Sequence, residues 1–523
     1  MSTKSQGNSL VLRTAWCPGA GSLPVRAATL GVILVFIVRA AEYFGHAAQA
    51  IAFHFEIDYG EGIVWQQSLL IPGPRMYGDI TQFPYIVFHY TPVYYLVVRA
   101  IVATFGIDPL VAGRAVTLAA TLVIALLAGA IAFTAMRAIV STTAQIVGAS
   151  LAGLMVFTYQ PVQAWAAMMR VDMLAISFSM AGVYLAIVAG QRTIVLCAAF
   201  LMFVVAVYTK QTELSAPIAA MLVVVAVNAR SAWAGAVFGL LIGGVAFIIL
   251  ELKTGGGFWH HIFEYNLNHF SLHVLKRNIR DQLPDALGVL VGVLAFAFLW
   301  WADASSIAPQ SLRDWVDALR QSQRLRALMI LSLWFAFASV QLVSLGKWGS
   351  ASNYFIEWMC ITTVPTGMFM SLVWDRAATR DTVVRFAGPM GFLLSLALAV
   401  HALHRPLVQF AIVGDRNAIA IRSHLVNLIR ENPKPSLSED MGLLLRAGQA
   451  VPIEPAIFDD LTARGIWDQR PFLRLIRDHA FGLVIFREAE DEVFTREVTN
   501  AVQKNYPLIE HIGDYTVRRP LEP

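Results

Sequence analysis

Residues 113–136 read GRAVTLAATLVIALLAGAIAFTAM, and stretches of this kind decide the class of the fold. The only charge in it is Arg114 at the second position, and the other residues are apolar, small or hydroxylic. A helix that crosses the hydrocarbon core of a bilayer needs about 20 predominantly apolar residues. The stretch therefore predicts a membrane-spanning helix.

Comparable stretches recur up to residue 402. The further candidate spans are 26–44, 84–105, 146–164, 172–190, 193–209, 212–228, 232–251, 283–301, 326–345, 354–374 and 383–402. Composition agrees with them, because 57% of the residues are hydrophobic, only 14% are charged and the mean hydropathy is +0.60. Soluble domains carry roughly a quarter charged residues. We expect an α-helical polytopic membrane protein with about 11–13 transmembrane helices.

Lysine and arginine residues near the spans predict the orientation. The N-terminus and the loops 302–326 and 375–385 are basic and are expected in the cytoplasm. The first loop, 46–82, and the tail after the last span then face outward. One conflict arises, because eight candidate spans precede the second loop, 253–281, and would place it inside. We expect that one candidate within 146–228 is broken or re-entrant, which non-helical backbone lining a cavity allows.

The character of the chain changes near residue 405, where charges return at ordinary density. Helix spacing covers 417–430 and 494–504, a buried strand is expected at 481–486, and short strands at 507–511 and 514–518. The sequence thus divides into a membrane module, 1–404, and a small C-terminal α/β soluble domain, 405–523, on the outer side.

The first outward loop carries an acidic motif. Residues 54–62 read HFEIDYGEG, and Asp58 and Glu61 would share one face of a helical turn. A carboxylate at the membrane surface can act as a general base toward a hydroxyl, particularly when partial burial raises its pKa. A solvated acidic turn is the alternative.

The same loop continues into polar and aromatic residues. Asp79 ends the segment GPRMYGD at 73–79, and His89 and Tyr90 lie in PYIVFHYTPVYY at 84–95. Aromatic side chains are ordinary anchors at a membrane interface. His89 can equally be a hydrogen-bonded interfacial histidine.

Taken together, these motifs resemble the GT-C superfamily of polytopic glycosyltransferases, in the branch related to protein mannosyltransferases and the lipid A aminoarabinose transferase. The resemblance covers roughly residues 26–280 and is weaker over the later helices. It implies the GT-C fold, a polyprenyl-phosphate sugar as donor, inverting transfer at the outer face, and an acidic first-loop residue as catalytic base. By position, Asp58 is the base. Glu61 matches the second acidic residue of the family signature, here spread over DYGE, so either carboxylate can take the proton.

Four charged residues elsewhere match family positions that serve the substrate: Arg114, Arg170, Asp172 and Lys210. The last three lie in RVD at 170–172 and YTKQT at 208–212. A lysine there suits a donor phosphate as a point charge. The alternatives are a local ion pair between Arg170 and Asp172, snorkelling of Lys210 and a positive-inside anchor at Arg114.

The second loop contains four histidines, and two of them, His269 and His273, have the i,i+4 spacing of a metal chelate. No HExxH motif and no third acidic ligand accompany them, so an interfacial amphipathic helix explains the run better. The three cysteines are far apart and form no CxxC motif. We expect no metal or other cofactor. Because this loop borders the donor cavity in the superfamily, His269 is a candidate substrate contact, as is Lys347 in the outward segment GKWG.

These features predict a hexosyl- or pentosyltransferase that moves a sugar from polyprenyl phosphate to a lipid, glycan or protein acceptor. Its partners would be the donor, the acceptor and membrane lipids. Nucleic acid is not expected, because the net charge is only +4 and no basic run exists. The expected location is a bacterial inner membrane, with the site facing the periplasm or exterior. The rival reading is a transporter or lipid flippase, which would show repeated halves; the sequence shows none. A scaffolding membrane protein is a third reading.

Overall fold

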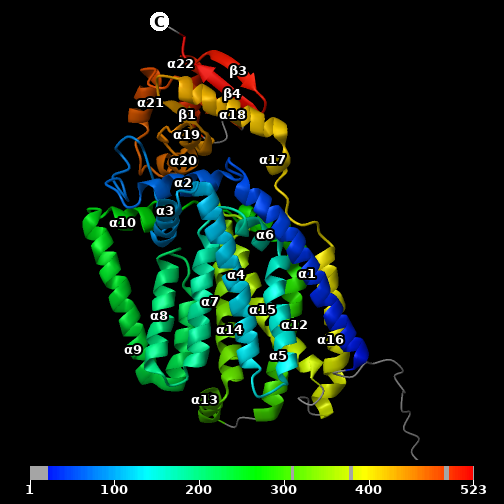
Figure 1. The fold of residues 1–523 in the computed structure, drawn as a ribbon. Coiled ribbons are helices and arrows are strands. Elements are labelled where there is room, and N and C mark those ends of the chain that lie inside the picture. The colour runs from blue at the N-terminus through cyan, green and yellow to red at the C-terminus, as the bar shows by residue number, and fades with distance from the viewer. Residues whose placement is uncertain (1–21, 308–310, 376–380, 488–493, 522–523) are drawn as a thin grey trace, which may run out of the picture.

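The computed structural model describes residues 22–307, 311–375, 381–487 and 494–521. A bundle of long helices carries a smaller mixed domain on one end (Figure 1). The helices of the bundle are α1 (Leu23–Ala52), α4 (Pro109–Ala135), α5 (Thr142–Met155), α7 (Asp172–Ala189), α8 (Thr193–Val207), α9 (Ser215–Lys253), α12 (Ala286–Ile307), α14 (Gln323–Gln341), α15 (Tyr354–Trp374) and α16 (Asp381–Leu403).

Among the described residues, eight helical segments are long and apolar enough to cross a membrane, or nine with one bent pair. The bent pair is Thr142–Thr158 with α6 (Gln160–Ala166), which turn by 75° at the extended residue Tyr159. A bend is thus present in one candidate within 146–228, as expected, but the segment that contains it still crosses the bundle. The protein is a multi-pass integral membrane protein.

The long helix α9 is a hairpin rather than one span. Asn228 has non-helical backbone angles and divides it. Before that residue, Ser215 donates to Gln341 at the end of α14, and the Val227 carbonyl accepts from Arg320 of α13 (Leu312–Gln321) at the opposite end of the bundle. After it, Gly243 has returned to Tyr208 at the end of α8. The two spans predicted at 212–228 and 232–251 are therefore both present.

The span predicted at 84–105 is wrong. Its helical part, α3 (Val93–Phe105), has only 13 residues and lies beside α2 (Tyr59–Leu70) at the end of the bundle that carries the soluble domain (Figure 1). Residues 84–92 contain two prolines and form loop structure that packs against protein. Removing this span resolves the orientation conflict, and the bend at Tyr159 is not needed for it. With α8 and both halves of α9 counted, eleven described segments run the length of the bundle, the lower end of the predicted range.

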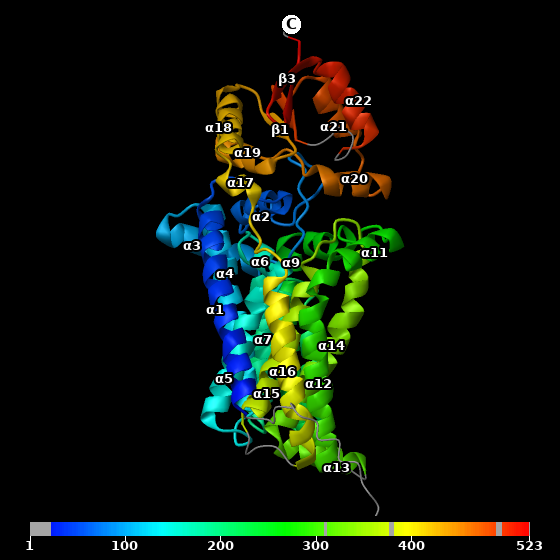
Figure 2. The same ribbon diagram turned by 90° about the vertical axis from the view of Figure 1, so that its right-hand side faces the viewer.

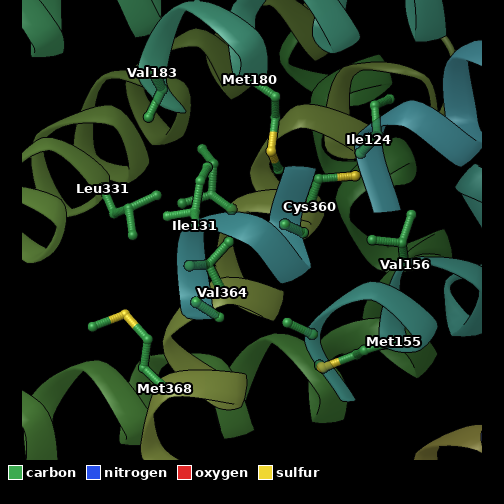
Figure 3. Close-up of a cluster of buried hydrophobic side chains, with 14 of the residues drawn as sticks. Ile124, Ile131, Met155, Val156, Met180, Val183, Leu331, Cys360, Val364 and Met368 are labelled. Carbon is green, nitrogen blue, oxygen red and sulfur yellow. The ribbon is translucent and has the colours of Figure 1, made fainter. Parts of the chain in front are cut away.

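The core of the bundle surrounds α15, 94% of whose most apolar window is buried. Figure 3 shows its side chains Val364 and Met368 among residues of α4, α5, α7 and α14. Glycines let α5 and α15 approach closely, because a Cβ on Gly148 would lie 2.3 Å from the Gly367 carbonyl oxygen. Small residues at such crossings are typical of helix packing in membranes.

The soluble domain contains one four-stranded sheet with the order β1-β2-β4-β3, in which β1 and β2 are parallel and the other pairs antiparallel. The strands are β1 (Ser436–Ser438), β2 (Leu483–Phe486), β3 (Leu508–Ile512) and β4 (Tyr515–Arg519). The helices are α17 (Ala411–Gly414), α18 (Arg416–Glu431), α19 (Met441–Ala447), α20 (Pro455–Ala463), α21 (Arg470–Arg477) and α22 (Arg496–Asn505). The expected helices and strands of the tail are thus present.

The first loop joins the soluble domain to the bundle (Figure 2). Tyr85 forms a parallel bridge with Ile453, and its backbone N–H donates to the Pro452 carbonyl at 2.8 Å. The second loop packs against the first loop, with Phe258 on Tyr77, and forms α10 (Gly257–Trp259), the π-helical turn His260–Glu264 and α11 (Leu272–Asp281).

Candidate functional site

A cavity of about 380 Å³ lies where the first loop, the second loop and the soluble domain meet. The start of α2 and residues 89–90 supply one part of its wall, and residues 210–212 and 347–354 supply another. The soluble domain closes it with Glu454 and α20. Several charged candidates from distant parts of the sequence meet in this cavity.

Asp58 lies at the cavity wall as the N-cap of α2, where its carboxylate accepts the Gly60 N–H at 2.9 Å. Its side chain is 39% exposed, and it forms an ion pair with Arg170. The guanidinium lies directly on the α-carbon of Gly60, because a Cβ there would be 1.8 Å from Arg170 Nη1. Asp58 is thus an accessible carboxylate whose charge is balanced by one partly buried cation.

Glu61 lies three residues further, but it faces the protein interior. Its carboxylate accepts the backbone N–H groups of Ile57 and Met169 at 2.7 and 2.6 Å, and Arg114 pairs with it at 2.6 Å. Both side chains of the pair are fully buried. The remaining Arg114 donors go to the carbonyls of Ala50, Phe53 and Phe55. Neither residue lines the cavity, and the pair fastens the first loop to the end of α1.

Lys210 lies in the turn between α8 and α9, where it is buried and lines the cavity. Its Nζ donates to Asp172 at 2.8 Å and lies 5.2 Å from the centre of the Tyr354 ring. Asn353 donates to the same Asp172 oxygen. Burial alone would lower the pKa of Lys210, but the carboxylates of Asp172 and Glu213 raise it above its ordinary value. Lys210 is therefore a fixed cation.

Two sequence alternatives are excluded by these contacts. Lys210 does not snorkel, because its side chain is only 7% exposed and is paired with Asp172. Arg170 and Asp172 do not pair with each other, since Arg170 binds Asp58 and Asp172 binds Lys210. Asp172 holds the lysine in place without lining the cavity itself.

His89 and Tyr90 also line the cavity. The His89 ring lies between two oxygen atoms, with Nε2 at 2.7 Å from Glu454 Oε2 and Nδ1 at 3.2 Å from Asn266 Oδ1. Burial lowers the pKa of His89, but the charge of Glu454 outweighs it and the pKa is raised. Of these contacts, Glu454 was not a candidate from the sequence.

Lys347 lines the cavity from the segment between α14 and α15, where its backbone forms a bridge with Phe270 of the second loop. His269 lies next to this bridge and contributes only its carbonyl, which accepts from the Trp348 N–H at 2.9 Å. Asp79 is outside the cavity too. It accepts from the Thr81 N–H and hydroxyl, and these bonds lower its pKa.

Further cavity residues escaped sequence reasoning: Asn353, Tyr354, Glu454 and Asp460. Tyr354 could have been found, because it opens a span at the same end as the first loop. The tail residues carried no signal. As for metals, nowhere in the described ranges do three histidine, cysteine, aspartate or glutamate side chains gather as a metal site requires.

Comparisons with known proteins support the fold only. No family model and no curated protein matches the sequence. The crystal structure of ArnT from Cupriavidus metallidurans bound to undecaprenyl phosphate is similar, with a TM-score of 0.53 at 14% identity over 92% of this chain and 97% of that one. The same protein in the apo state gives a TM-score of 0.46 at 15% identity, over 94% and 98%. The similarity to the undecaprenyl phosphate complex confirms the GT-C fold that the sequence motifs implied.

Proposed function

We propose that this protein is a membrane-embedded glycosyltransferase that transfers a sugar from a polyprenyl-phosphate donor to an acceptor hydroxyl. The observation that carries the proposal is the cavity itself, in which the accessible carboxylate of Asp58 stands near the cations Arg170, Lys210 and Lys347. The shared fold supports the lipid donor, because the similar ArnT structure is bound to undecaprenyl phosphate.

In this reaction Asp58 is the general base. It takes the proton of the acceptor hydroxyl while that oxygen forms a bond to the anomeric carbon. The bond from that carbon to the phosphate oxygen breaks, and the lipid phosphate leaves with the electron pair. Attack from the side opposite the phosphate inverts the anomeric configuration. Glu61 is not suited to this role, because its oxygens already accept two backbone N–H groups and the Arg114 guanidinium.

The cations stabilise the leaving phosphate. Lys210 is buried and oriented by Asp172, so its charge is in position before the donor binds. Preorganised cations at the place where negative charge develops are a principal source of rate enhancement in group transfer. Lys347 is a further phosphate contact. We expect the reaction to proceed without a metal ion.

The helices α2 and α20, which line the cavity, lie at the end of the bundle opposite α13, the helix that contains Arg320 and precedes Arg324 and Arg326 (Figure 1). Since basic loops stay in the cytoplasm, transfer takes place on the outer face. The soluble domain is then periplasmic or extracellular.

The test compares Asp58→Asn with Asp281→Asn, a control at an exposed carboxylate of the second loop. Transfer from a panel of radiolabelled undecaprenyl-phosphate sugars would be measured in proteoliposomes. Loss of a general base lowers kcat by about 10²- to 10⁴-fold, whereas binding of undecaprenyl phosphate to Asp58→Asn should persist. Normal transfer by Asp58→Asn would refute Asp58 as the base. Solute movement without a glycosyl product would favour a transporter instead.

Glu61→Gln separates the second carboxylate from catalysis. Breaking a buried ion pair costs about 3–5 kcal/mol, so this variant should lose thermal stability. Any activity it retains per folded molecule should be close to that of the wild type.

A further inference from the structure

His89 connects four segments around the cavity. Its ring contacts Glu454, at the start of α20 in the soluble domain, and Asn266 of the second loop. Its backbone carbonyl accepts from Gln211 Nε2 at 2.9 Å, next to Lys210. The next residue, Tyr90, lines the cavity. The ring therefore links the soluble domain to the segments that carry the cavity's cations.

The geometry requires a doubly protonated ring. At Nε2 the ring donates to Glu454 Oε2. At Nδ1 the partner is the side-chain amide of Asn266, and the orientation of that amide decides whether its oxygen or its nitrogen faces the ring. The amide nitrogen of Asn266 donates to the His261 carbonyl at 2.6 Å, so its oxygen must face the ring. A neutral imidazole has only one N–H donor. With oxygen acceptors at both nitrogens, only the imidazolium makes both hydrogen bonds.

Glu454 supplies the negative charge that balances the His89 imidazolium. The soluble domain that carries it is also held in place by other contacts. Glu454 is only 5% exposed and precedes α20, which contributes Ile457 and Asp460 to the cavity wall. Tyr85 and Ile453 hold the soluble domain next to the first loop independently of this pair. Replacing Glu454 should therefore change the charge state of His89 without releasing the domain.

We propose that Glu454 is a positioning residue that keeps His89 as an imidazolium, and that this bridge fixes the cavity wall for binding of the lipid phosphate. The inference rests on the proposed function, because it concerns the same cavity. It assigns the soluble domain a part in the donor site, acting through His89 on the segment that carries Lys210.

The groups around the His89–Glu454 pair indicate that the positive charge of His89 depends on Glu454. The titratable groups that interact with the pair are Tyr90 on the same loop, Tyr95 of α3, Tyr59 of α2 and His261 of the second loop, and Lys210 interacts with Tyr90. His261 is neutral, since its Nδ1 accepts from the Phe88 N–H and its Nε2 donates to the Gly78 carbonyl. Lys210 is balanced by Asp172. Among the described residues that face His89, Glu454 is thus the anion that can hold its proton.

The experiment measures the Kd for undecaprenyl phosphate between pH 5.5 and 8 for the wild type, Glu454→Gln and Asp468→Asn. Asp468 is an exposed carboxylate of the soluble domain that does not line the cavity. We expect Glu454→Gln to bind about tenfold more weakly than the wild type at pH 8, where its His89 is neutral and a charged hydrogen bond is lost. The difference should become smaller only at a pH low enough for His89 of the variant to regain its proton. Asp468→Asn should follow the wild type throughout. Equal Kd values for Glu454→Gln and the wild type at pH 8, in folded protein, would overturn the proposal.

A second readout keeps this inference separate from the proposed function. If the wild type binds no undecaprenyl phosphate at any pH, the proposed function fails, and the bridge is judged by thermal unfolding. A histidine with a raised folded pKa stabilises the protein at low pH and loses that contribution as the pH rises through the folded pKa. The Tm advantage of the wild type over Glu454→Gln should then shrink from pH 6 toward alkaline pH. A constant difference would refute the imidazolium.

Discussion

Arg170 reaches Asp58 across the α-carbon of Gly60, so a methyl group at that position would collide with the guanidinium. A Cβ on Gly60 would lie 1.8 Å from Arg170 Nη1 and 2.2 Å from Nη2. Gly60→Ala should therefore move the arginine away from Asp58 and from the donor phosphate. Because a displacement of about 1 Å can cost up to a hundredfold in rate, we expect transfer to fall by roughly one to two orders of magnitude.

The control for this prediction is Gly45→Ala in α1, where an added Cβ would have no neighbour within 4 Å. Transfer and Tm would be measured for both variants. Since the displaced group is the end of a flexible side chain, Gly60→Ala should lose activity with little change in Tm. Equal activity of the two variants would show that the contact between Arg170 and Asp58 does not matter.

Glu56 makes the stability depend on pH. Its side chain is 3% exposed, lies next to Asp440 and accepts the Gly442 N–H at 3.1 Å. Burial and the neighbouring Asp440 raise its pKa well above the ordinary value. A carboxyl with a raised folded pKa binds more protons in the folded state, so stability falls as the pH rises from its unfolded pKa toward the folded one.

Glu56→Gln keeps a neutral group of similar shape and removes this pH dependence. Relative to the wild type, its Tm should therefore increase from pH 5 to pH 8. One pKa unit corresponds to about 1.4 kcal/mol, which is large enough to measure by thermal unfolding. If the two proteins keep the same difference in Tm across this range, Glu56 does not hold its proton in the folded protein.

At the residue scale, the sequence was informative where charges interrupt apolar spans. Arg170 and Lys210 stand out for that reason and Asp58 for its acidic loop motif, and the structure brings all three to one cavity. Glu454 lies 365 residues from its partner His89, in a segment of ordinary charge density. Only the folded chain shows that contact, because nothing local distinguishes this glutamate from its neighbours in the tail.

At the scale of elements, hydropathy identified the membrane spans. It could not show whether an apolar stretch is surrounded by lipid or buried within the protein. The stretch 84–105 is apolar enough to resemble a span, yet Tyr85, Val87 and Phe88 are buried in contact with other parts of the protein. Conversely, the two halves of α9 are both apolar along their length, and the sequence separated them correctly near Asn228.

The hairpin in α9 predicts which side of the membrane its residues face. In a cysteine-free background, Arg230→Cys and Lys276→Cys would each be labelled with a membrane-impermeant maleimide. Both positions are exposed, and they lie at opposite ends of the bundle because α9 turns at Asn228. Lys276→Cys should be labelled from outside, together with Ser423→Cys of the soluble domain. Arg230→Cys should react only after permeabilisation; labelling of all three from one side would contradict the hairpin.

On the scale of the whole molecule, the first loop is part of the core of the soluble domain, so the two parts should not fold independently. The Tyr85 residue is 3% exposed, and its ring centroid lies 5.1–6.1 Å from the ring centroids of Phe458, Trp467 and Phe472.

Truncating a buried aromatic side chain costs about 3–5 kcal/mol. Tyr85→Ala should therefore loosen the soluble domain, increase proteolysis of the tail and reduce donor binding. Phe83→Ala is the matched control, since Phe83 is 48% exposed in the same loop. If the tail of Tyr85→Ala is as resistant to protease as that of Phe83→Ala, the domain is anchored elsewhere, and Glu454 would have to be held at the cavity by contacts other than those of the first loop.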